Sequence, residues 1–347
     1  MSRILLRLIL MSVLLSGCLP TATPSITTTP APTSVMIEPE GFFQRVHDPV
    51  IAYEDDTYYV YHTGSRIPFI CSPDKVVWEF CGRIFETNPA WTRDINPDLA
   101  DIWAPDISFF NQRWHLYYAV SAFGSQNSAI GLATNITLDP QDPDYAWVDH
   151  GMVLRSQPGD AWNAIDPNLV LDENGQPWLA WGSYWQGIWM RKIDAATGML
   201  AQDDPKTHQL ADRSTGPDHT TAIEAPFIIR HDNQWYLFVS FDQCCQGAAS
   251  TYNVRVGRSA ALTGPYVDRS GAALTKGGGT LILSEYGQWK GSGHNGILLE
   301  DGIYWMVYHA YDANQIGIPK LRIESIFWDE EGWPSLRSQN EKPTPEN

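Results

Sequence analysis

One repeated stretch decides the fold, and its third copy reads Asp166-Pro167-Asn168-Leu169-Val170-Leu171-Asp172-Glu173-Asn174-Gly175-Gln176-Pro177-Trp178-Leu179-Ala180-Trp181. A polar residue beside a proline opens a short apolar segment. Turn-forming side chains follow at 172–175, and an aromatic-rich segment comes after them. Two short apolar runs on either side of such a turn are typical of a β-hairpin.

The same pattern, with a glycine in place of the proline in the fifth copy, occurs five times at intervals of roughly 60 residues. The five paired segments are 48–51 with 58–61, 104–107 with 114–117, 166–169 with 178–181, 224–227 with 235–238, and 294–297 with 304–307. No segment shows a long helical period. A strand-rich repeat of this length is typical of propeller blades of four strands each. The sequence therefore predicts an all-β protein with a five-bladed β-propeller over residues 41–347.

The composition narrows the class of partner. The chain has 347 residues, 43% of them apolar, which is enough for a sizeable core. Its net charge of −17 and its lack of a basic stripe exclude nucleic acid as a partner and disfavour an anionic membrane surface. The 15 Trp and 15 Tyr residues suit both β-strands and stacking against sugar rings. We expect a monomer.

The first residues indicate export. Arg3 and Arg7 lie at the beginning of a short apolar run, 4–15, which is too short to span a membrane and is typical of a signal peptide. The run ends in Leu15-Ser16-Gly17-Cys18, which resembles the bacterial lipoprotein box. An ordinary signal peptide with an incidental cysteine is the alternative.

The lipoprotein interpretation divides the beginning of the chain in two. Residues 1–17 are the signal peptide, and Cys18 becomes the acylated N-terminal residue. The Thr/Pro-rich stretch 18–40 is then an extended tether. The protein is expected to be a cell-surface or periplasmic lipoprotein that touches the membrane only through its lipid anchor.

Four further cysteines leave the disulfide pattern open. Cys71 and Cys81 follow one another closely around a turn signal at 72–74, so a cross-strand disulfide is plausible in an exported protein. Cys244 and Cys245 are adjacent, and a bridge between them would close an unusual, strained ring. No cysteine spacing suggests zinc.

The repeat brings distant acidic residues together. The inner strand of each propeller blade begins near the central axis, so the residues that open the copies should face a shared funnel. Asp48, Asp166 and Glu224 are three such residues. Glycoside hydrolysis needs one neutral carboxyl group that protonates the leaving oxygen and one carboxylate that activates water. Taken singly, each acid would be interpreted as a turn or strand cap.

The residues around these acids carry a family resemblance that covers about residues 45–333. The strings that carry the likeness are His47-Asp48-Pro49, Trp103-Ala104-Pro105-Asp106, Trp162-Asn163-Ala164-Ile165-Asp166-Pro167, Ile223-Glu224-Ala225-Pro226-Phe227, Ser121-Ala122-Phe123-Gly124, Cys244-Cys245, Ser250-Thr251-Tyr252, Gly293-His294-Asn295 and Tyr308-His309-Ala310-Tyr311. With these strings the sequence resembles glycoside hydrolase family 43, and within it the endo-1,5-α-L-arabinanases.

The resemblance implies an inverting mechanism with separate roles for the three acids. Asp48 matches the general base, Glu224 matches the general acid, and Asp166 matches a third carboxylate that raises the pKa of the acid and orients it. Inversion requires the carboxyl groups of the base and the acid to lie about 6.5–9.5 Å apart.

The resemblance also implies the substrate contacts. They are Asp48, Gly124, Asn163, Ala164, Ile165, Asp166, Gly182, Ser183 and Tyr184. Small residues among them let backbone groups approach a sugar closely. Trp103, Trp162 and Trp185 are candidates either for stacking on sugars or for the propeller core.

His294 opens the fifth copy, and the resemblance implies that it helps to hold a metal ion, usually calcium. Calcium prefers oxygen ligands, so one histidine completed by waters would be an unusual site. Another ion, or a histidine that only donates a hydrogen bond in the funnel, is the alternative.

Taken together, these features predict an enzyme that cleaves internal α-1,5-L-arabinofuranosidic bonds in arabinan. An exo-acting arabinanase, an arabinofuranosidase or a xylosidase of the same family is the first alternative. A non-catalytic sugar-binding propeller is the second, although it predicts the loss of at least one acid, and all three are present.

Overall fold

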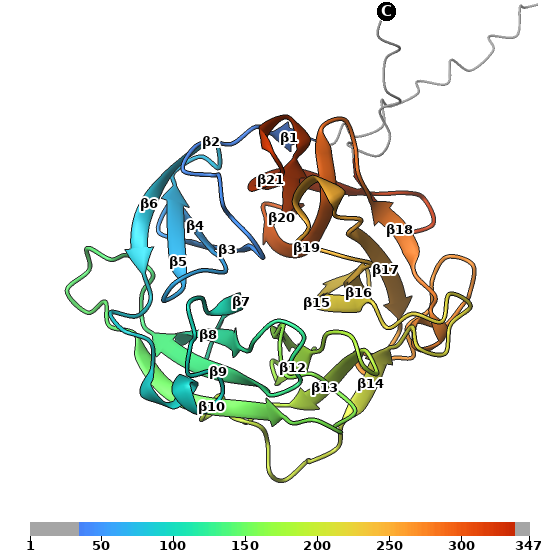
Figure 1. Ribbon diagram of the computed structural model, residues 1–347, viewed down its shortest axis with the longest axis horizontal. Coiled ribbons are helices and arrows are strands. Elements are labelled where there is room, and N and C mark those ends of the chain that lie inside the picture. Colours follow the sequence, from blue (N-terminus) through green and yellow to red (C-terminus); the bar gives the residue numbers. More distant parts are fainter. Residues whose placement is uncertain (1–34, 337–347) are drawn as a thin grey trace, which may run out of the picture. The chain divides into compact units, whose positions relative to one another are not determined.

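The computed structural model describes residues 35–336, which form five β-sheets arranged around a central axis (Figure 1). This arrangement confirms the predicted five-bladed all-β propeller. The helical elements of this part of the chain are short 3-10 turns: η1 (Ala90–Asp94), η2 (Gly247–Ala249), η3 (Leu274–Lys276) and η4 (Ala313–Gln315). Between residues 35 and 336, no helix is long and apolar enough to cross a lipid bilayer.

The first four blades follow one another along the chain. The first contains β3 (Val50–Glu54), β4 (Thr57–Tyr61), β5 (Pro68–Ser72) and β6 (Val77–Arg83), with β2 (Glu40–Gly41) added parallel to β6. The second contains β7 (Trp103–Phe110), β8 (Arg113–Val120), β9 (Ser128–Asn135) and β10 (Val148–Ser156). The third contains β11 (Asn168–Leu171), β12 (Pro177–Trp181), β13 (Ile188–Lys192) and β14 (His208–Ala211). The fourth contains β15 (Ile223–His231), β16 (Gln234–Phe241), β17 (Asn253–Ser259) and β18 (Thr280–Leu283).

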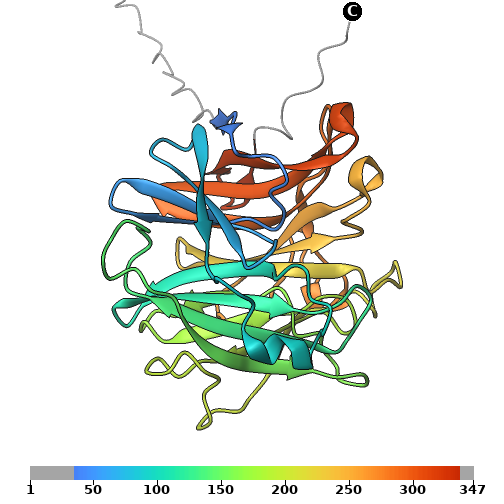
Figure 2. The ribbon, with the colours of Figure 1, turned by 60° about the vertical axis from the view of Figure 1, so that its left-hand side comes forward.

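The fifth blade joins the two ends of the propeller. It contains β19 (Trp289–Glu300), β20 (Ile303–Asp312) and β21 (Ile318–Trp328), with β22 (Pro334–Ser335) paired to β21. Its remaining strand is β1 (Met36–Ile37), which pairs antiparallel with β21. In Figures 1 and 2, β1 in blue lies against the red sheet at the end of the chain. The propeller therefore begins before the expected boundary at residue 41, because an N-terminal strand closes the ring. Residues 1–34, with Cys18 and most of the expected tether, lie outside the described residues.

The hydrophobic core is divided among the interfaces between neighbouring blades. Each of five buried clusters draws its side chains from two adjacent sheets. One, for example, combines Tyr117 and Leu132 of the second blade with Leu179 and Trp181 of the third. The aromatic segments of the repeat supply much of this packing, because alternate side chains of a strand face opposite neighbours.

A shared backbone feature marks the start of each inner strand. At this point of each blade, one residue has a positive φ that non-glycine residues rarely adopt. The five are Asp48 (51°), Ala104 (43°), Asp166 (55°), Ala225 (54°) and His294 (50°). In β7, β15 and β19 the pairing register shifts across this residue, as in a β-bulge. A bulge bends the strand and re-aims its side chains.

This feature corrects one detail of the sequence alignment. Ala225, and not Glu224, is the fourth blade's equivalent of Asp48 and Asp166. Glu224 comes one residue earlier, and the register shift between Glu224 and Phe227 sets it apart from the regular alternation of the strand. The acidic residues therefore reach the axis from two different backbone positions.

Both possible disulfides are formed. Cys71 and Cys81 bridge the adjacent strands β5 and β6 with their Cα atoms 5.9 Å apart, as expected for a cross-strand pair. The neighbouring residues Cys244 and Cys245 are also bonded to one another.

Candidate active site

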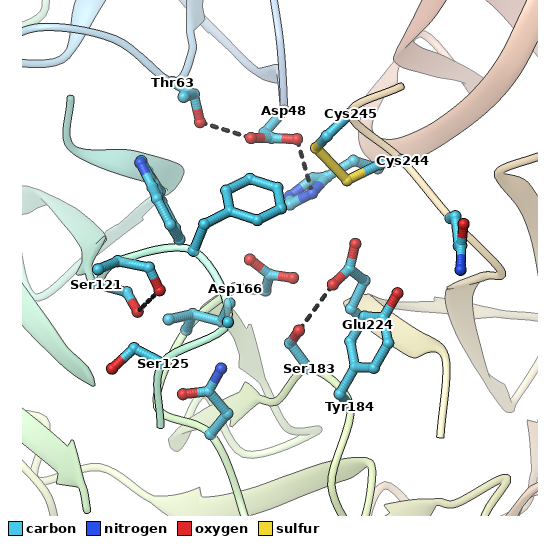
Figure 3. Close-up of a pocket in the computed structure, with 18 of the residues that line it drawn as sticks. Asp48, Thr63, Ser121, Ser125, Asp166, Ser183, Tyr184, Glu224, Cys244 and Cys245 are labelled. Atoms are coloured by element: carbon cyan, nitrogen blue, oxygen red, sulfur yellow. Dashed lines mark hydrogen bonds and ion pairs between the residues drawn. A yellow bond between two sulfur atoms is a disulfide. The ribbon is translucent and has the colours of Figure 1, made fainter. Parts of the chain in front are cut away.

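The inner ends of the blades surround a cavity of about 790 Å³. Most of the predicted site residues line it: Asp48, Gly124, Asn163, Ile165, Asp166, Ser183, Tyr184, Glu224 and His294. Figure 3 shows Asp48, Asp166 and Glu224 directed into the same space from three blades. The propeller thus brings together acids that are 58 or more residues apart in the sequence.

Two predicted substrate contacts are not part of this wall. Ala164 is fully buried, and its backbone N–H donates to Ser156 Oγ at 2.9 Å. Gly182 has a φ of 137°, and a Cβ there would lie 2.3 Å from the carbonyl oxygen of Gly187. Both residues shape the backbone behind the cavity, where their small size allows close packing.

Asp48 is held as a carboxylate by several donors. Thr63 Oγ1 donates to its Oδ2 at 2.6 Å, and His47 Nδ1 lies 2.9 Å from the same oxygen. His294 Nδ1 lies 3.1 Å from the other oxygen, Oδ1. Burial alone would raise the pKa of Asp48, but the charges and hydrogen bonds of His47 and His294 hold that pKa well below its usual value. A group of this kind stays ionised and can accept a proton from water.

Glu224 has the opposite electrostatic character. It is 9% exposed, and burial raises its pKa above the usual value, with the charge of Asp48 adding to the increase. Ser183 Oγ donates to Oε2 at 2.7 Å and Tyr252 Oη donates to Oε1 at 2.8 Å, and both bonds oppose the rise. These two donors also fix the direction of the carboxyl group. A buried, oriented carboxyl group with a raised pKa is suited to act as a general acid.

Asp166 faces the same space as the other two acids in Figure 3. Its Oδ2 accepts a hydrogen bond from the backbone N–H of Ala225 at 3.1 Å, which holds the residue next to Glu224 in place. Burial raises the pKa of Asp166, and the negative charges of Glu224 and Asp48 raise it further. Asp166 and Glu224 repel one another when both are ionised, so a proton on either of them is favoured.

His294 forms a buried ion pair with Asp48. Burial alone would lower the pKa of His294, but the neighbouring carboxylates, Asp48 first, raise it to about 9. The surrounding donors do not make a calcium site by themselves. In the described part of the chain, the acids and histidines with ligand atoms within 4.8 Å of one another are His47, Asp48 and His309, with a single carboxylate among them. Calcium takes six to eight oxygen ligands, so no chemical step is assigned to a metal here.

The tryptophans divide between the cavity and the core. Trp103 and Trp185 line the cavity, together with Phe123. The exposed Phe123 ring is 82% accessible and contacts the ring of Trp103 edge-on, at 6.0 Å between centroids. Trp162 instead packs edge-on against Trp181 and Trp189 of the third blade; it is partly buried against the core and does not line the cavity.

Sequence reasoning missed two functional contacts. Thr63 lies after β4 and donates to Asp48, and no motif marked it. Tyr252 stood in a recognised string, Ser250-Thr251-Tyr252, but nothing in the sequence placed its hydroxyl on Glu224. Both contacts join segments that only the closed ring of blades brings together.

The chain matches a family model along most of its length. The model described as glycosyl hydrolases family 43 covers residues 42–334. The chain belongs to glycosyl hydrolase family 43. It is therefore a glycoside hydrolase, as the three acids at the axis of the propeller indicate.

Two curated relatives and one solved structure are similar to this chain over most of its length. An extracellular exo-α-(1→5)-L-arabinofuranosidase of Cellvibrio japonicus is 42% identical over 299 residues, covering 84% of this chain and 86% of that protein. An extracellular endo-α-(1→5)-L-arabinanase of Bacillus subtilis is 40% identical over 297 residues, covering 84% and 88%. The solved structure of Cellvibrio cellulosa α-L-arabinanase complexed with arabinohexaose is 40% identical, with a TM-score of 0.81, and covers 85% of this chain and 96% of that one.

The pKa shifts predict the pH profile of this family 43 hydrolase. Activity should persist well into acid, because Asp48 is protonated only below its lowered pKa, and it should fall as pH rises through the raised pKa of Glu224. The Ser183→Ala variant removes a bond that favours ionised Glu224, so the basic limb of kcat/KM should move to higher pH while the acid limb stays. Ser121→Ala is the control, because Ser121 lines the cavity and bonds to Ser128. A basic limb that moves to lower pH in Ser183→Ala would contradict the assignment of Glu224 as the general acid.

Gly293 makes room for Tyr252. A Cβ at this position would lie 2.1 Å from Tyr252 Cδ1, so the Gly293→Ala variant must displace the ring and weaken its bond to Glu224. We expect kcat/KM to fall by up to about tenfold, the effect of losing one buried hydrogen bond that orients the acid. Gly302→Ala is the control, because Gly302 has a φ of 79° but nothing within 4 Å of a new Cβ. Steady-state kinetics measure both variants, and equal kcat/KM values would show that the Tyr252 hydrogen bond does not contribute to catalysis.

Proposed function

We propose that this hydrolase cleaves internal α-1,5-L-arabinofuranosidic bonds of arabinan with inversion of configuration. The observation that carries the proposal is the pair of buried carboxyl groups in one cavity, Asp48 with a lowered pKa and Glu224 with a raised pKa. The relatives named as arabinanases and arabinofuranosidases support the choice of sugar.

The proposed reaction assigns each acid one task. Asp48 removes a proton from the attacking water, while Glu224 gives its proton to the leaving sugar oxygen. Asp166 is a positioning residue, because it holds the backbone beside Glu224. When Asp166 is ionised, its repulsion of an ionised Glu224 favours the protonated acid. Inversion follows if water attacks the face opposite to the leaving group in a single displacement.

Two experiments test this proposal. Product analysis on linear 1,5-arabinan should show a mixture of oligosaccharides early in the reaction. Proton NMR of the first product should show the β-anomer, since the bond that breaks is α. No hydrolysis would overturn the proposal in favour of a sugar-binding propeller, and an α-anomer would overturn the inverting mechanism.

Exo action is the second candidate. The relative from Cellvibrio japonicus is named as an exo-acting enzyme and is 42% identical to this chain. This candidate predicts a single short product from the beginning of the reaction. The same time course of products therefore separates endo from exo action.

We also propose that the mature protein is exported and carried by a lipid on Cys18. Two relatives are named as extracellular, which supports export. The lipid rests on the sequence Leu15-Ser16-Gly17-Cys18 alone. Radioactive palmitate fed to expressing bacteria should label the wild type and not the Cys18→Ala variant. Equal labelling of both proteins would show that Cys18 does not carry the lipid.

The calcium ion expected at His294 stays a proposal that depends on water ligands, because the protein supplies few oxygens. Elemental analysis of purified protein, compared with the His294→Gln variant, tests it. A metal content near zero in both proteins would contradict the proposed calcium site.

A further inference from the structure

The bonded pair Cys244 and Cys245 lies at the cavity wall beside the proposed base. Both residues line the cavity, and Figure 3 shows their disulfide next to Asp48. The roles assigned to the three acids do not involve this disulfide. Its position beside the proposed base points to an effect on the chemical step.

A continuous chain of hydrogen bonds leads from this disulfide to Asp48. The backbone N–H of Cys245 donates to Tyr311 Oη at 2.8 Å. The same Oη lies 2.7 Å from His47 Nε2, and His47 Nδ1 lies 2.9 Å from Asp48 Oδ2. His47 Nδ1–H donates to the Asp48 carboxylate, and Nε2 of the same ring shares a hydrogen bond with the Tyr311 hydroxyl group, so the ring links the two groups.

The members of this chain are held rigidly. Tyr311 is 3% exposed, and burial raises the pKa of its hydroxyl group, so that group keeps its proton. The His47 ring stacks on His309 at 3.9 Å between centroids. His309 Nδ1 also accepts the backbone N–H of Asp48 at 3.1 Å, so the two histidines hold the base from both its side chain and its backbone.

The turn that carries the disulfide is fixed at its far end as well. Gln246 N–H donates to Ser250 Oγ at 3.0 Å, and Thr251 N–H donates to the carbonyl of Gln243 at 2.9 Å. Gly317 packs so closely on this turn that a Cβ there would lie 2.3 Å from the backbone nitrogen of Ala248. The bond between neighbouring cysteines removes further backbone freedom and so fixes the direction of the Cys245 N–H.

We propose that the Cys244–Cys245 turn is a positioning element for the general base, acting on Asp48 through Tyr311 and His47. This inference rests on the proposed role of Asp48 as the base. It assigns the disulfide an effect on the rate of the chemical step rather than on sugar binding. Because the bridge stays formed in an oxidising compartment, it suits an exported enzyme.

The Tyr311→Phe variant is the first test. It deletes one hydroxyl group, which leaves Cys245 N–H without its partner and leaves His47 Nε2 with only its weak contact to Cys245 Sγ at 3.9 Å. We expect kcat on a linear arabino-oligosaccharide to fall by about tenfold with KM unchanged within about twofold. Tyr117→Phe is the matched control, because this buried hydroxyl donates to the Gly198 carbonyl at 2.7 Å and does not line the cavity. An equal kcat in the two variants, with both folded by thermal unfolding, overturns the inference.

A double-mutant cycle tests whether the disulfide acts through Tyr311. The variant Cys244→Ser/Cys245→Ser should lower kcat by roughly three- to tenfold in the wild-type background and by less than about twofold in the Tyr311→Phe background. The matched control is Cys71→Ser/Cys81→Ser, which opens the bridge between β5 and β6 and should leave kcat unchanged in both backgrounds. Additive losses overturn the inference, since they would show that the disulfide acts independently of Tyr311.

Failure of this inference can be distinguished from failure of the proposed function. If the Asp48→Asn variant is inactive while Tyr311→Phe matches its control, the base assignment stands and this inference fails. If the wild type does not hydrolyse arabinan, the proposed function fails and the positioning role fails with it.

Discussion

Replacing Glu224 by glutamine is expected to lower kcat/KM on linear arabinan by about 10²–10⁴-fold, the usual contribution of a general acid. The amide keeps the size of the side chain, and the Ser183 and Tyr252 hydroxyl groups remain beside it. What is lost is the proton for the leaving sugar oxygen. An aryl arabinofuranoside whose leaving group needs no proton should therefore be turned over with a much smaller loss.

This contrast between two substrates identifies the acid. Glu300→Gln is the matched control, because Glu300 pairs with Lys75 and does not line the cavity. It should leave both substrates unaffected. If the Glu224→Gln variant loses the same factor on both substrates, Glu224 does not protonate the leaving group.

Asp48→Asn should lower kcat/KM by a similar factor of about 10²–10⁴, but on both kinds of substrate. Water needs its base whatever the leaving group is. Azide is a nucleophile that needs no base, so it should restore turnover of the aryl arabinofuranoside in this variant. The product should be the β-azide, because attack occurs on the face opposite to the α-linked leaving group.

Asp106→Asn is the matched control for this prediction. Asp106 is also a buried acid near the start of an inner strand, and its oxygens accept from Asn168 Nδ2 at 3.1 Å and Leu169 N–H at 2.8 Å. These bonds join the second and third blades, and Asp106 does not line the cavity. The variant should therefore lose stability and keep its kcat. Failure of azide to restore activity in Asp48→Asn would leave Asp48 without a role in activating water.

The blades could be predicted because their signals are local. A turn such as 172–175 and the apolar runs beside it are read from contiguous residues. Local signals also placed Asp48 and Asp166 at blade starts, where both have the same left-handed backbone conformation. They misplaced Glu224 by one position, since a β-bulge is an irregularity that leaves no mark on the alternation of side chains.

The N-terminal strand and the Cys244–Cys245 disulfide could not be predicted, because neither has a local signal in the sequence. Met36–Ile37 pairs with β21, almost the whole length of the domain away, and nothing in two residues announces a strand. The pairing of Cys244 with Cys245 was left open because adjacent cysteines bond only where the surrounding fold holds their turn in a suitable conformation. Long-range closure of the ring decided the first, and tertiary contacts around the turn decided the second.

By itself, the sequence determined the number of blades, the meeting of three acids at one axis and the family to which these motifs are similar. Only the tertiary structure decided the electrostatic character of each acid. The pKa of Asp48 is low because His47 and His294 face it, and that of Glu224 is high because it is buried. Burial and the partners Thr63, Ser183 and Tyr252 come from segments far apart in the chain. A pKa depends on these surroundings in space, which no local stretch of sequence contains.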